Sequence, residues 1–427
     1  MARLTRNADP QQHPFERDRE YTRALVATKL ERMFAKPFVA QLGRGHVDGV
    51  YVLAQDSSAL DRCASGSGDG VVKVWDLESK SELWHVQAHE AIVRGLCWTK
   101  ERRILSCASD RTIKLFDPYN SAPDSPPLGT WLGHGAFTAL SHHQQAGVFA
   151  ASSDSISIYD LNHVSSTPIQ KLSWPTAHDT LRCLAFNPSE TSVLASASTD
   201  RSLTLYDLRT SSALHRTIMT LAPNSLCWNP MEPFNIAAAS EDHNIYLFDT
   251  RNMKRALNVL RDHVNAVMDI SFSPTGQELV SASYDRTVRL WRRNEGHSRD
   301  VYHTKRMQRV FSAKYTADSK YVISGSDDGN VRVWRANASE RSGVASARQR
   351  LKMEYDQALR ARYGHLPEIR RIGRHRHVPR VIMKESEKKA VETGAAKRRK
   401  QNERKYSRKG EVGPSSEREK MVLATER

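Results

Sequence analysis

Polar and apolar residues alternate most regularly along residues 281–291, where two short strands flank a tight turn at residues 284–286. In the second strand, Val288 and Leu290 fall on one face and the polar residues beside them fall on the other. Alternation of this kind is typical of a strand with one buried face. The segment therefore predicts an antiparallel hairpin that packs its apolar side against a neighbour.

The same pattern recurs along most of the chain, and every copy ends in an aromatic residue. Successive copies lie 41 to 47 residues apart, with the terminal aromatic residues at Trp75, Phe116, Tyr159, Tyr206, Phe248, Trp291 and Trp334. A period of about 40 to 45 residues is typical of WD repeats, each of which supplies the four strands of one propeller blade. We therefore expect an all-β protein built around a seven-bladed WD-repeat β-propeller.

Residues 38–42 also have the composition of a strand, although they precede the first complete repeat. The last repeat, which ends at Trp334, provides three strands and lacks a fourth. We expect residues 38–42 to complete blade 7, because closing the ring removes the unpaired edges that all-β proteins must avoid. The propeller is then predicted to span residues 38–336.

Extensions are predicted on both sides of the propeller. Residues 1–37 are expected to hold a short helix from Tyr21 to Phe34, and residues 337–390 are expected to form a C-terminal helical domain. Residues 391–427 are highly charged and are expected to form a basic disordered tail. The apolar residues of the N-terminal helix fall on one face that should pack on a partner surface: Leu25, Val26, Leu30, Met33 and Phe34.

The positive charge is concentrated at the ends of the chain. The whole chain has 64 Lys and Arg against 48 Asp and Glu, a formal net charge of +16. Residues 341–427 hold 25 basic and 11 acidic residues, whereas residues 46–340 hold 30 and 32. A near-neutral body with a basic end indicates an anionic partner, with nucleic acid as the first candidate.

The spacing of the cysteines and the lengths of the apolar runs indicate the cellular compartment of the protein. The five cysteines lack CxxC spacing and fall in predicted strands, as expected for small buried residues in a reducing compartment. No apolar run reaches the roughly 18 residues of a membrane-spanning helix, and the N-terminus lacks the apolar core of a signal peptide. The sequence predicts a soluble intracellular protein without a membrane partner.

Histidines precede the inner strands of five blades, and each can pair with an Asp in the following turn. The histidines are His46, His89, His134, His178 and His263. In the WD family such a histidine forms a buried set with a strand Ser, the turn Asp and the final Trp. Two blades carry the complete set: His46, Ser65, Asp69 and Trp75 in blade 1, and His263, Ser281, Asp285 and Trp291 in blade 6. A carboxylate beside an imidazole resembles a catalytic dyad, but its repetition at regular spacing favours a structural role.

The sequence offers no residues for an enzyme mechanism. It contains no Gly-rich phosphate loop, nucleophile elbow, His-Glu-x-x-His or paired-Cys metal motif. The histidines of residues 374–377 are metal ligands in principle, but flanking arginines would repel a divalent cation and no further ligands complete a site. We expect no enzymatic activity, no cofactor, no metal and no small-molecule substrate.

Two basic segments are candidates for macromolecular contact. One is expected to bind RNA or ribonucleoprotein through phosphate neutralisation and through histidine stacking: Arg370, Arg371, Arg374, His375, Arg376, His377 and Arg380. A solvated charge run is the alternative, but Ile372 and Val378 interrupt the charge and favour contact. The other segment suits nuclear import: Lys397, Arg398, Arg399 and Lys400.

In two neighbouring blades the terminal aromatic-Asp pair is followed two residues later by Arg. The pairs are Asp207 with Arg209 and Asp249 with Arg251. This arrangement resembles the signature of substrate receptors that dock on the adaptor of a cullin-type ubiquitin ligase. A solvated arginine at a strand end is the alternative interpretation.

Segments outside the repeats resemble the suppressor-of-fibrillarin family of nucleolar WD-repeat proteins. The similar segments are residues 17–38, 301–308, 336–340 and 355–379. This resemblance implies a nuclear and nucleolar component of the U3 small nucleolar ribonucleoprotein (snoRNP) and of the small-subunit processome. Its implied partners are pre-rRNA, the U3 snoRNA-containing ribonucleoprotein and other processome proteins, including the fibrillarin-containing particle.

Two functional hypotheses follow from the sequence. In the first, the protein is a ribosome-biogenesis factor that scaffolds pre-rRNA processing toward 18S rRNA. In the second, which rests on the resemblance of animal family members to cullin-ligase receptors, it is a substrate receptor of a ubiquitin ligase. The basic C-terminal segment is needed for the first hypothesis and not for the second.

Overall fold

The computed structural model describes residues 13–56, 58–120, 125–164, 167–175, 179–340, 344–408, 411, 413 and 416–426. It divides into two compact units. The first comprises residues 1–37 and 337–377, and the second comprises residues 38–336 and 378–427. Each unit is built from two separate stretches of chain.

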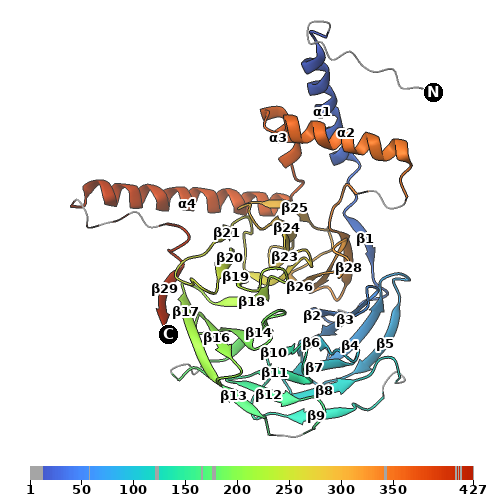
Figure 1. Cartoon of the computed structure of the whole chain (residues 1–427), viewed down its shortest axis with the longest axis vertical. Helices are drawn as coiled ribbons and strands as arrows, with labels where there is room; N and C mark the ends of the chain where they lie inside the picture. Colours follow the sequence, from blue (N-terminus) through green and yellow to red (C-terminus); the bar gives the residue numbers. More distant parts are fainter. Residues whose placement is uncertain are drawn as a thin grey trace. The chain divides into compact units, whose positions relative to one another are not determined.

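The second unit contains a ring of seven antiparallel sheets, each forming one blade (Figure 1). The first four blades are β2–β5 (Val50–Gln55, Arg62–Ser67, Val71–Asp76, Glu82–Gln87), β6–β9 (Val93–Trp98, Ile104–Ala108, Thr112–Phe116, Gly129–Leu132), β10–β13 (Ala139–His142, Val148–Ser152, Ile156–Asp160, Gln170–Leu172) and β14–β17 (Leu181–Phe186, Val193–Ser198, Ser202–Asp207, Ser212–Met219). The others are β18–β21 (Pro223–Trp228, Asn235–Ser240, Ile245–Asp249, Asn258–Leu260), β22–β25 (Val267–Phe272, Glu278–Ser283, Val288–Arg292, Ser298–Tyr302) and β26–β28 (Val310–Tyr315, Tyr321–Ser326, Val331–Arg335) with β1. The predicted seven-bladed propeller is confirmed.

Blade 7 is completed by the strand that precedes blade 1. Strand β1 (Phe38–Gln41) pairs antiparallel with β28, and Phe38 lies opposite Trp334 in the register. The two rings meet edge to face with their centroids 5.5 Å apart. The first and last parts of the propeller are thereby joined by a ladder of backbone hydrogen bonds, as the sequence predicts.

Apolar side chains from neighbouring sheets fill the spaces between blades. Trp75, Trp291 and Trp334, the penultimate residues of the third strands of blades 1, 6 and 7, are at most 1% exposed. Burial of such large rings stabilises the contact of one blade with the next, since buried apolar area is the main favourable term in folding. Each repeat in the sequence thus contributes one set of apolar residues that packs between two neighbouring blades.

The first unit is a small helical bundle. It contains α1 (Glu16–Met33), α2 (Ala347–Tyr363) and α3 (Pro367–Arg374). Ser346 and Gln349 form a capping box at the start of α2, and Pro367 occupies the first turn of α3, where it needs no backbone donor. The core joins all three helices through Ala24, Leu359 and Ile369.

The buried face of α1 differs from the predicted one. Ala24 and Thr28 are buried, with Tyr21 and Leu25 packed beside them. Four of the five residues expected to pack are exposed instead: Val26, Leu30, Met33 and Phe34. The helix starts five residues earlier than predicted, and its small residues face the core because they let α1 approach the other two helices closely.

Residues beyond 377 also differ from the prediction. The stretch predicted as a disordered tail from residue 391 contains most of α4 (Arg380–Tyr406) and a further strand, β29 (Val422–Glu426). Strand β29 pairs with β17 as a fifth strand of blade 4. Lys, Glu, Arg and Ala are good helix formers, so a charge-rich composition is compatible with α4. The boundary placed at residue 390 falls inside that helix, and the structure separates the units at residue 377.

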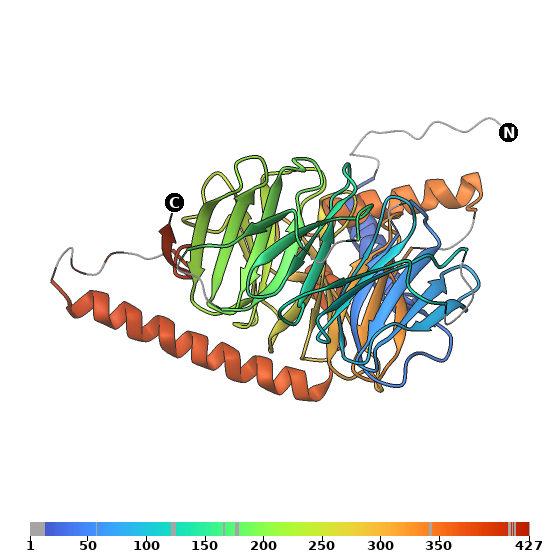
Figure 2. The same ribbon diagram turned by 90° about the horizontal axis from the view of Figure 1, so that it is seen from below.

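Helix α4 lies along one face of the propeller (Figure 2). This face carries the turns between the second and third strands of the blades, and we call it the turn face. Among the described residues, no helix combines the length and apolarity needed to cross a membrane.

Candidate interaction surfaces

The four polar and aromatic residues of blade 6 form one buried hydrogen-bonded set. Nδ1 of His263 lies 2.8 Å from Oδ2 of Asp285, and Nε2 lies 2.6 Å from Oγ of Ser281. The indole N–H of Trp291 donates to the same Ser281 oxygen over 2.7 Å. Burial lowers the pKa of His263, although Asp285 opposes the shift. A neutral imidazole that donates to the carboxylate and accepts from the hydroxyl satisfies these bonds. All four residues are at most 5% exposed, so the set is scaffold rather than a substrate site.

The corresponding set in blade 1 lacks one of its predicted contacts. Nε2 of His46 lies 2.6 Å from Oγ of Ser65, and Trp75 donates to that oxygen over 2.7 Å. Asp69 instead accepts the backbone N–H of Val71. Nδ1 of His46 has no hydrogen-bond partner within the described part of the chain. The prediction that Asp69 pairs with His46 is wrong, and burial lowers the pKa of His46 to about 4.

The partner of the turn Asp varies among the other blades. His89 pairs with Asp110 over 2.8 Å, but His134 is exposed and His178 lies outside the described residues. In blade 4, Asp200 forms an ion pair of 2.6 Å with Arg216 from the fourth strand. An arginine is therefore a partner of the turn Asp in this blade. The sequence signal for it, a cation at an otherwise buried strand position, was not recognised.

The two strand-end arginines of blades 4 and 5 fold back on their own Asp. The backbone N–H groups of Arg209 and Arg251 donate to Asp207 and Asp249 over 2.9 and 3.0 Å. Their guanidinium groups pair with the same carboxylates at 3.3 and 2.9 Å. These hydrogen bonds lower the pKa of both Asp side chains.

Both arginines are available to a partner. The Arg209 and Arg251 side chains are 77% and 67% exposed, and the guanidinium of Arg251 also covers the Phe234 ring at 4.1 Å. They follow the third strands of adjacent blades, at the end opposite to the turn face. The structure therefore exposes both of them at the same end of adjacent blades, and we call them the strand-end arginines.

The first basic segment is divided between the two units. Arg370, Arg371 and Arg374 are exposed on α3, whose Ile369 is buried in the core of the first unit. The exposed His375 and His377 follow the helix, together with Arg376, whose Nη1 donates to the carbonyl oxygen of Gly373 over 2.7 Å. Arg380 begins α4 and belongs to the second unit. A folded helix, not a flexible tail, therefore positions the three arginines, which we call the α3 arginines.

The second basic segment lies within α4. Arg398, Arg399 and Lys400 are exposed, whereas Lys397 forms an ion pair of 3.5 Å with Glu417. This accessibility is compatible with the predicted import role.

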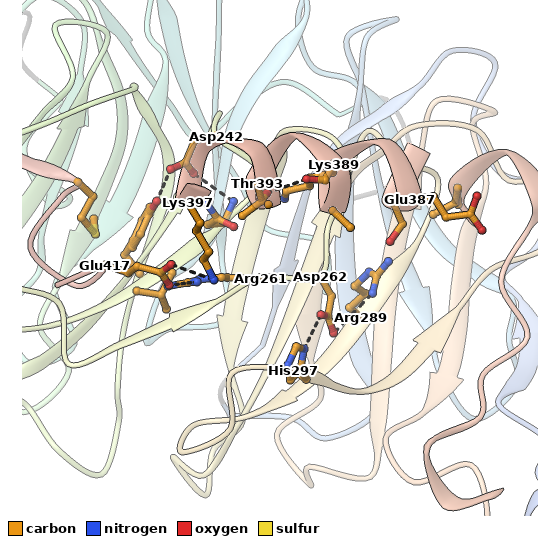
Figure 3. Close-up of a pocket in the computed structure, with 18 of the residues that line it drawn as sticks. Asp242, Arg261, Asp262, Arg289, His297, Glu387, Lys389, Thr393, Lys397 and Glu417 are labelled. Atoms are coloured by element: carbon orange, nitrogen blue, oxygen red, sulfur yellow. Dashed lines mark hydrogen bonds and ion pairs between the residues drawn. The ribbon is translucent and has the colours of Figure 1, made fainter. Parts of the chain in front are cut away.

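A cavity of about 920 Å³ separates α4 from blades 5 and 6 (Figure 3). Lys389 crosses it and donates to the backbone carbonyl oxygen of His263 over 2.7 Å. Burial lowers the pKa of Lys389, and the Asp242 carboxylate opposes that effect. Most other charged groups of the cavity are paired: Glu417 with Arg261 and Lys397, and Asp262 with His297. This arrangement serves to hold α4 on the propeller, and its anchoring lysine was not identified from the sequence.

Among the described residues, no group of three or more His, Cys, Asp or Glu side chains has a geometry suited to a metal ion. The five cysteines are free thiols, and burial raises the pKa of each of them. These thiols are therefore poor nucleophiles at neutral pH.

Comparison with known proteins identifies both parts of the chain. A family model described as Sof1-like domain matches residues 336–422, and one described as WD domain, G-beta repeat matches residues 38–76, 80–117, 166–207, 215–249, 254–292 and 295–335. The first three strands of blade 3, β10 to β12, fall between matched ranges, although all four strands are present. The Sof1-like match begins at the end of blade 7 and includes the α3 arginines, α4 and the start of β29.

Three relatives match over nearly the whole chain. Protein SOF1 of Saccharomyces cerevisiae is 47% identical, and the match covers 99% of this chain and 91% of the yeast protein. Protein sof1 of Schizosaccharomyces pombe is 52% identical over 99% and 95%. DDB1- and CUL4-associated factor 13 of Danio rerio is 45% identical over 99% and 95%.

A solved structure supports the architecture. The WD40 beta propeller domain of Doa1 superimposes with a TM-score of 0.59, covering 70% of this chain and 96% of that one at 22% identity. At this level of identity the similarity concerns the propeller fold alone. The propeller scaffold and the relatives together indicate a protein that is not an enzyme.

Proposed function

The chain belongs to the Sof1 family of ribosome-biogenesis WD-repeat proteins, and on that basis we propose that it is an assembly factor of the U3 snoRNP and the small-subunit processome. In this role it acts in the nucleolus and scaffolds the processing of pre-rRNA toward 18S rRNA. The propeller contacts other processome proteins, including the fibrillarin-containing particle. The first unit contacts pre-rRNA and the U3 snoRNA-containing ribonucleoprotein.

The observation that carries the proposal is the attachment of the α3 arginines to a folded unit. Because Ile369 is 3% exposed and packs against Ala24 and Leu359, the helix backbone that carries the three arginines is held in place. A pre-organised basic surface loses little conformational entropy on binding, so more of its electrostatic attraction appears as affinity. Arginine in particular recognises phosphate through two parallel N–H donors.

The test is co-sedimentation with pre-ribosomal particles. Arg370→Ala, Arg371→Ala and Arg374→Ala in one chain should shift the protein from the particle fractions to free fractions of a sucrose gradient. The matched control removes three exposed charges from the neighbouring helix: Arg348→Ala, Arg350→Ala and Lys352→Ala. Equal co-sedimentation of both variants with the unmodified protein contradicts the proposed RNA contact. Point changes are preferable to truncation at residue 337, which would remove the helices that pack on α1.

A second candidate function is that of a substrate receptor for a cullin-type ubiquitin ligase. It is supported by the name of the Danio rerio relative, DDB1- and CUL4-associated factor 13. The specific observation in its favour is the strand-end arginines, which are exposed on adjacent blades. This function needs the opposite end of the propeller from the turn face and is compatible with the first.

A further inference from the structure

Five side chains form a continuous row across blades 6, 7, 1 and 2 on the turn face. The Tyr51 and Phe311 rings are stacked at 4.6 Å between centroids, with 14° between their planes. Tyr284 meets Phe311 edge to face at 5.8 Å. An arginine lies at each end of the row. The Cζ atom of Arg94 is 5.6 Å from the centroid of the Tyr51 ring, and that of Arg309 is 5.4 Å from the centroid of the Tyr284 ring. We call these five residues the aromatic row.

The position of the row follows from the strands that carry it. Tyr51, Arg94 and Phe311 are each the second residue of the first strand of their blade. First strands of adjacent blades contact one another around the ring axis, and they begin at the turn face. Tyr284 lies in the turn between β23 and β24 of blade 6. The row therefore lies beside the axis of the propeller.

The row is accessible to a partner molecule. Its three rings are only half-buried, and the two arginines are exposed. By contrast, the aromatic residues that end the third strands are almost fully buried between blades. The rings of the row thus contribute less to the inter-blade cores and leave part of their surface, together with the two guanidinium groups, accessible.

Further cations lie on the same face. Arg111, Arg201 and Arg286 follow the turn Asp of blades 2, 4 and 6, and all three are exposed. Each has a left-handed backbone, with φ of 66°, 69° and 63°, a conformation that L-residues adopt rarely and at some cost. Glycine fills this turn position in blades 1 and 7. Three blades therefore place a long cation where a glycine would be less strained.

Acidic groups also lie near the row. Asp48 and Asp327 act on Tyr51, whose pKa is raised first by burial and then by the Asp48 charge. The Asp48 carboxylate is partly satisfied by the backbone N–H of Gly49 at 2.7 Å. Asp110, Asp200 and Asp285, which precede the three turn arginines, are at least partly buried, and each accepts a backbone N–H within its own turn. The arginine side chains are therefore the more accessible charges at these turns.

We propose that the turn face of the propeller is a second binding surface, for single-stranded RNA, with unpaired bases stacking on the aromatic row and phosphates meeting the surrounding arginines. Aromatic rings and guanidinium planes both accept bases, and the row extends at each end by a base stacked on Arg94 or Arg309. Duplex RNA keeps its bases stacked inside and cannot use the rings. An acidic peptide would use the arginines and leave the rings without a role.

The inference goes beyond the proposed function because it assigns RNA contact to the propeller as well as to the α3 arginines. The test uses the full chain and a short fluorescent oligouridylate, with affinity measured by anisotropy. Tyr51→Leu combined with Phe311→Leu replaces the stacked rings by smaller apolar side chains. We expect affinity to fall by roughly tenfold or more, because stacking on each base contributes substantially. An oligonucleotide of the same length with abasic positions should bind the variant and the unmodified protein equally.

A second variant, made at exposed positions, distinguishes a loss of RNA binding from a folding defect. Arg94→Gln with Arg309→Gln changes exposed side chains and should weaken binding and flatten its dependence on salt. Arg209→Gln with Arg251→Gln, at the opposite end of the blades, should leave RNA affinity unchanged.

Unchanged affinity in both row variants overturns the inference, as does an equal loss for the intact and the abasic oligonucleotide. The α3 arginine variant is measured in parallel. If it alone weakens RNA binding, the proposed function stands and this inference fails. If only the row variants weaken binding, the inference stands and the role assigned to α3 fails.

Discussion

The ammonium group of Lys389 donates a hydrogen bond to the backbone carbonyl oxygen of His263 over 2.7 Å. The imidazole of the same histidine is bonded to Asp285 inside blade 6. One residue therefore connects α4 to the buried hydrogen-bonded set of a blade, and the charged C-terminal segment is attached to the scaffold.

Removing this contact should loosen α4. In Lys389→Met we expect faster hydrogen exchange across α4, because the anchoring donor and its charge are lost. Exchange in blade 6 strands should change little, since their ladders remain. Lys388→Met is the matched control, because Lys388 is exposed and lies one position away. Equal exchange in the two variants would show that Lys389 does not hold the helix.

The turn carboxylates of blades 1 and 6 should differ in their effect on stability. Asp285→Asn leaves a buried histidine and a buried threonine with a poorer acceptor, so we expect a loss of about 3 kcal/mol in the free energy of unfolding. Asp69→Asn should cost much less, because Asp69 makes no hydrogen bond to His46 and caps only the turn. Denaturant unfolding followed by Trp fluorescence measures both. Similar losses in the two variants would contradict the assignment of different partners.

Acid should destabilise the propeller through His46. Its pKa falls from 6.5 to about 4 in the folded state, so the unfolded chain binds the proton more readily. Folding therefore favours the neutral form of His46. Its contribution to the free energy of unfolding is fully present above pH 6.5 and is lost as the pH decreases from 6.5 to about 4. At about 1.4 kcal/mol for each unit of pKa difference, the loss amounts to roughly 3 kcal/mol.

The check on this prediction is the slope of unfolding free energy against pH. His46→Gln should reduce that slope between pH 6.5 and 4, whereas His134→Gln should not, because His134 is exposed. An unchanged slope in His46→Gln would show that other groups cause the acid sensitivity.

These residues show how far the sequence specified the structure. The repeat period and the unpaired strand at residues 38–42 were sufficient to predict the ring and its closure. The reason is that strands pair in the same way in every blade, at a fixed spacing along the sequence. The partner of each turn Asp was less predictable. Asp200 pairs with Arg216 from another strand, and nothing in the local spacing marks that contact.

The extensions were the least predictable part of the chain. High charge predicted disorder after residue 391, but docking of α4 through Lys389 and pairing of β29 with β17 are tertiary contacts. Likewise, the apolar period of α1 indicated a packed face, whereas the small residues Ala24 and Thr28 form the actual one. The α3 arginines were identified as a basic segment, but their fixed presentation depends on the core of the first unit.

The strand-end arginines should be required for any contact with a cullin-ligase adaptor. Arg209→Ala with Arg251→Ala should abolish adaptor pull-down without lowering the unfolding temperature, because both side chains are exposed. Arg292→Ala is the matched control, since it removes an exposed arginine that follows the third-strand tryptophan in the next blade. If the double variant still binds the adaptor, the strand-end arginines are exposed charges that take no part in adaptor binding.

We propose above that the α3 arginines bring this protein to precursor ribosomal RNA. The most direct measurement is crosslinking followed by sequencing of the bound RNA, comparing the unmodified chain with Arg370→Ala, Arg371→Ala and Arg374→Ala combined. We predict that reads from pre-rRNA and U3 snoRNA dominate with the unmodified chain and fall severalfold in the variant, while the α2 control variant retains them. An unchanged RNA profile in the triple variant would contradict the account.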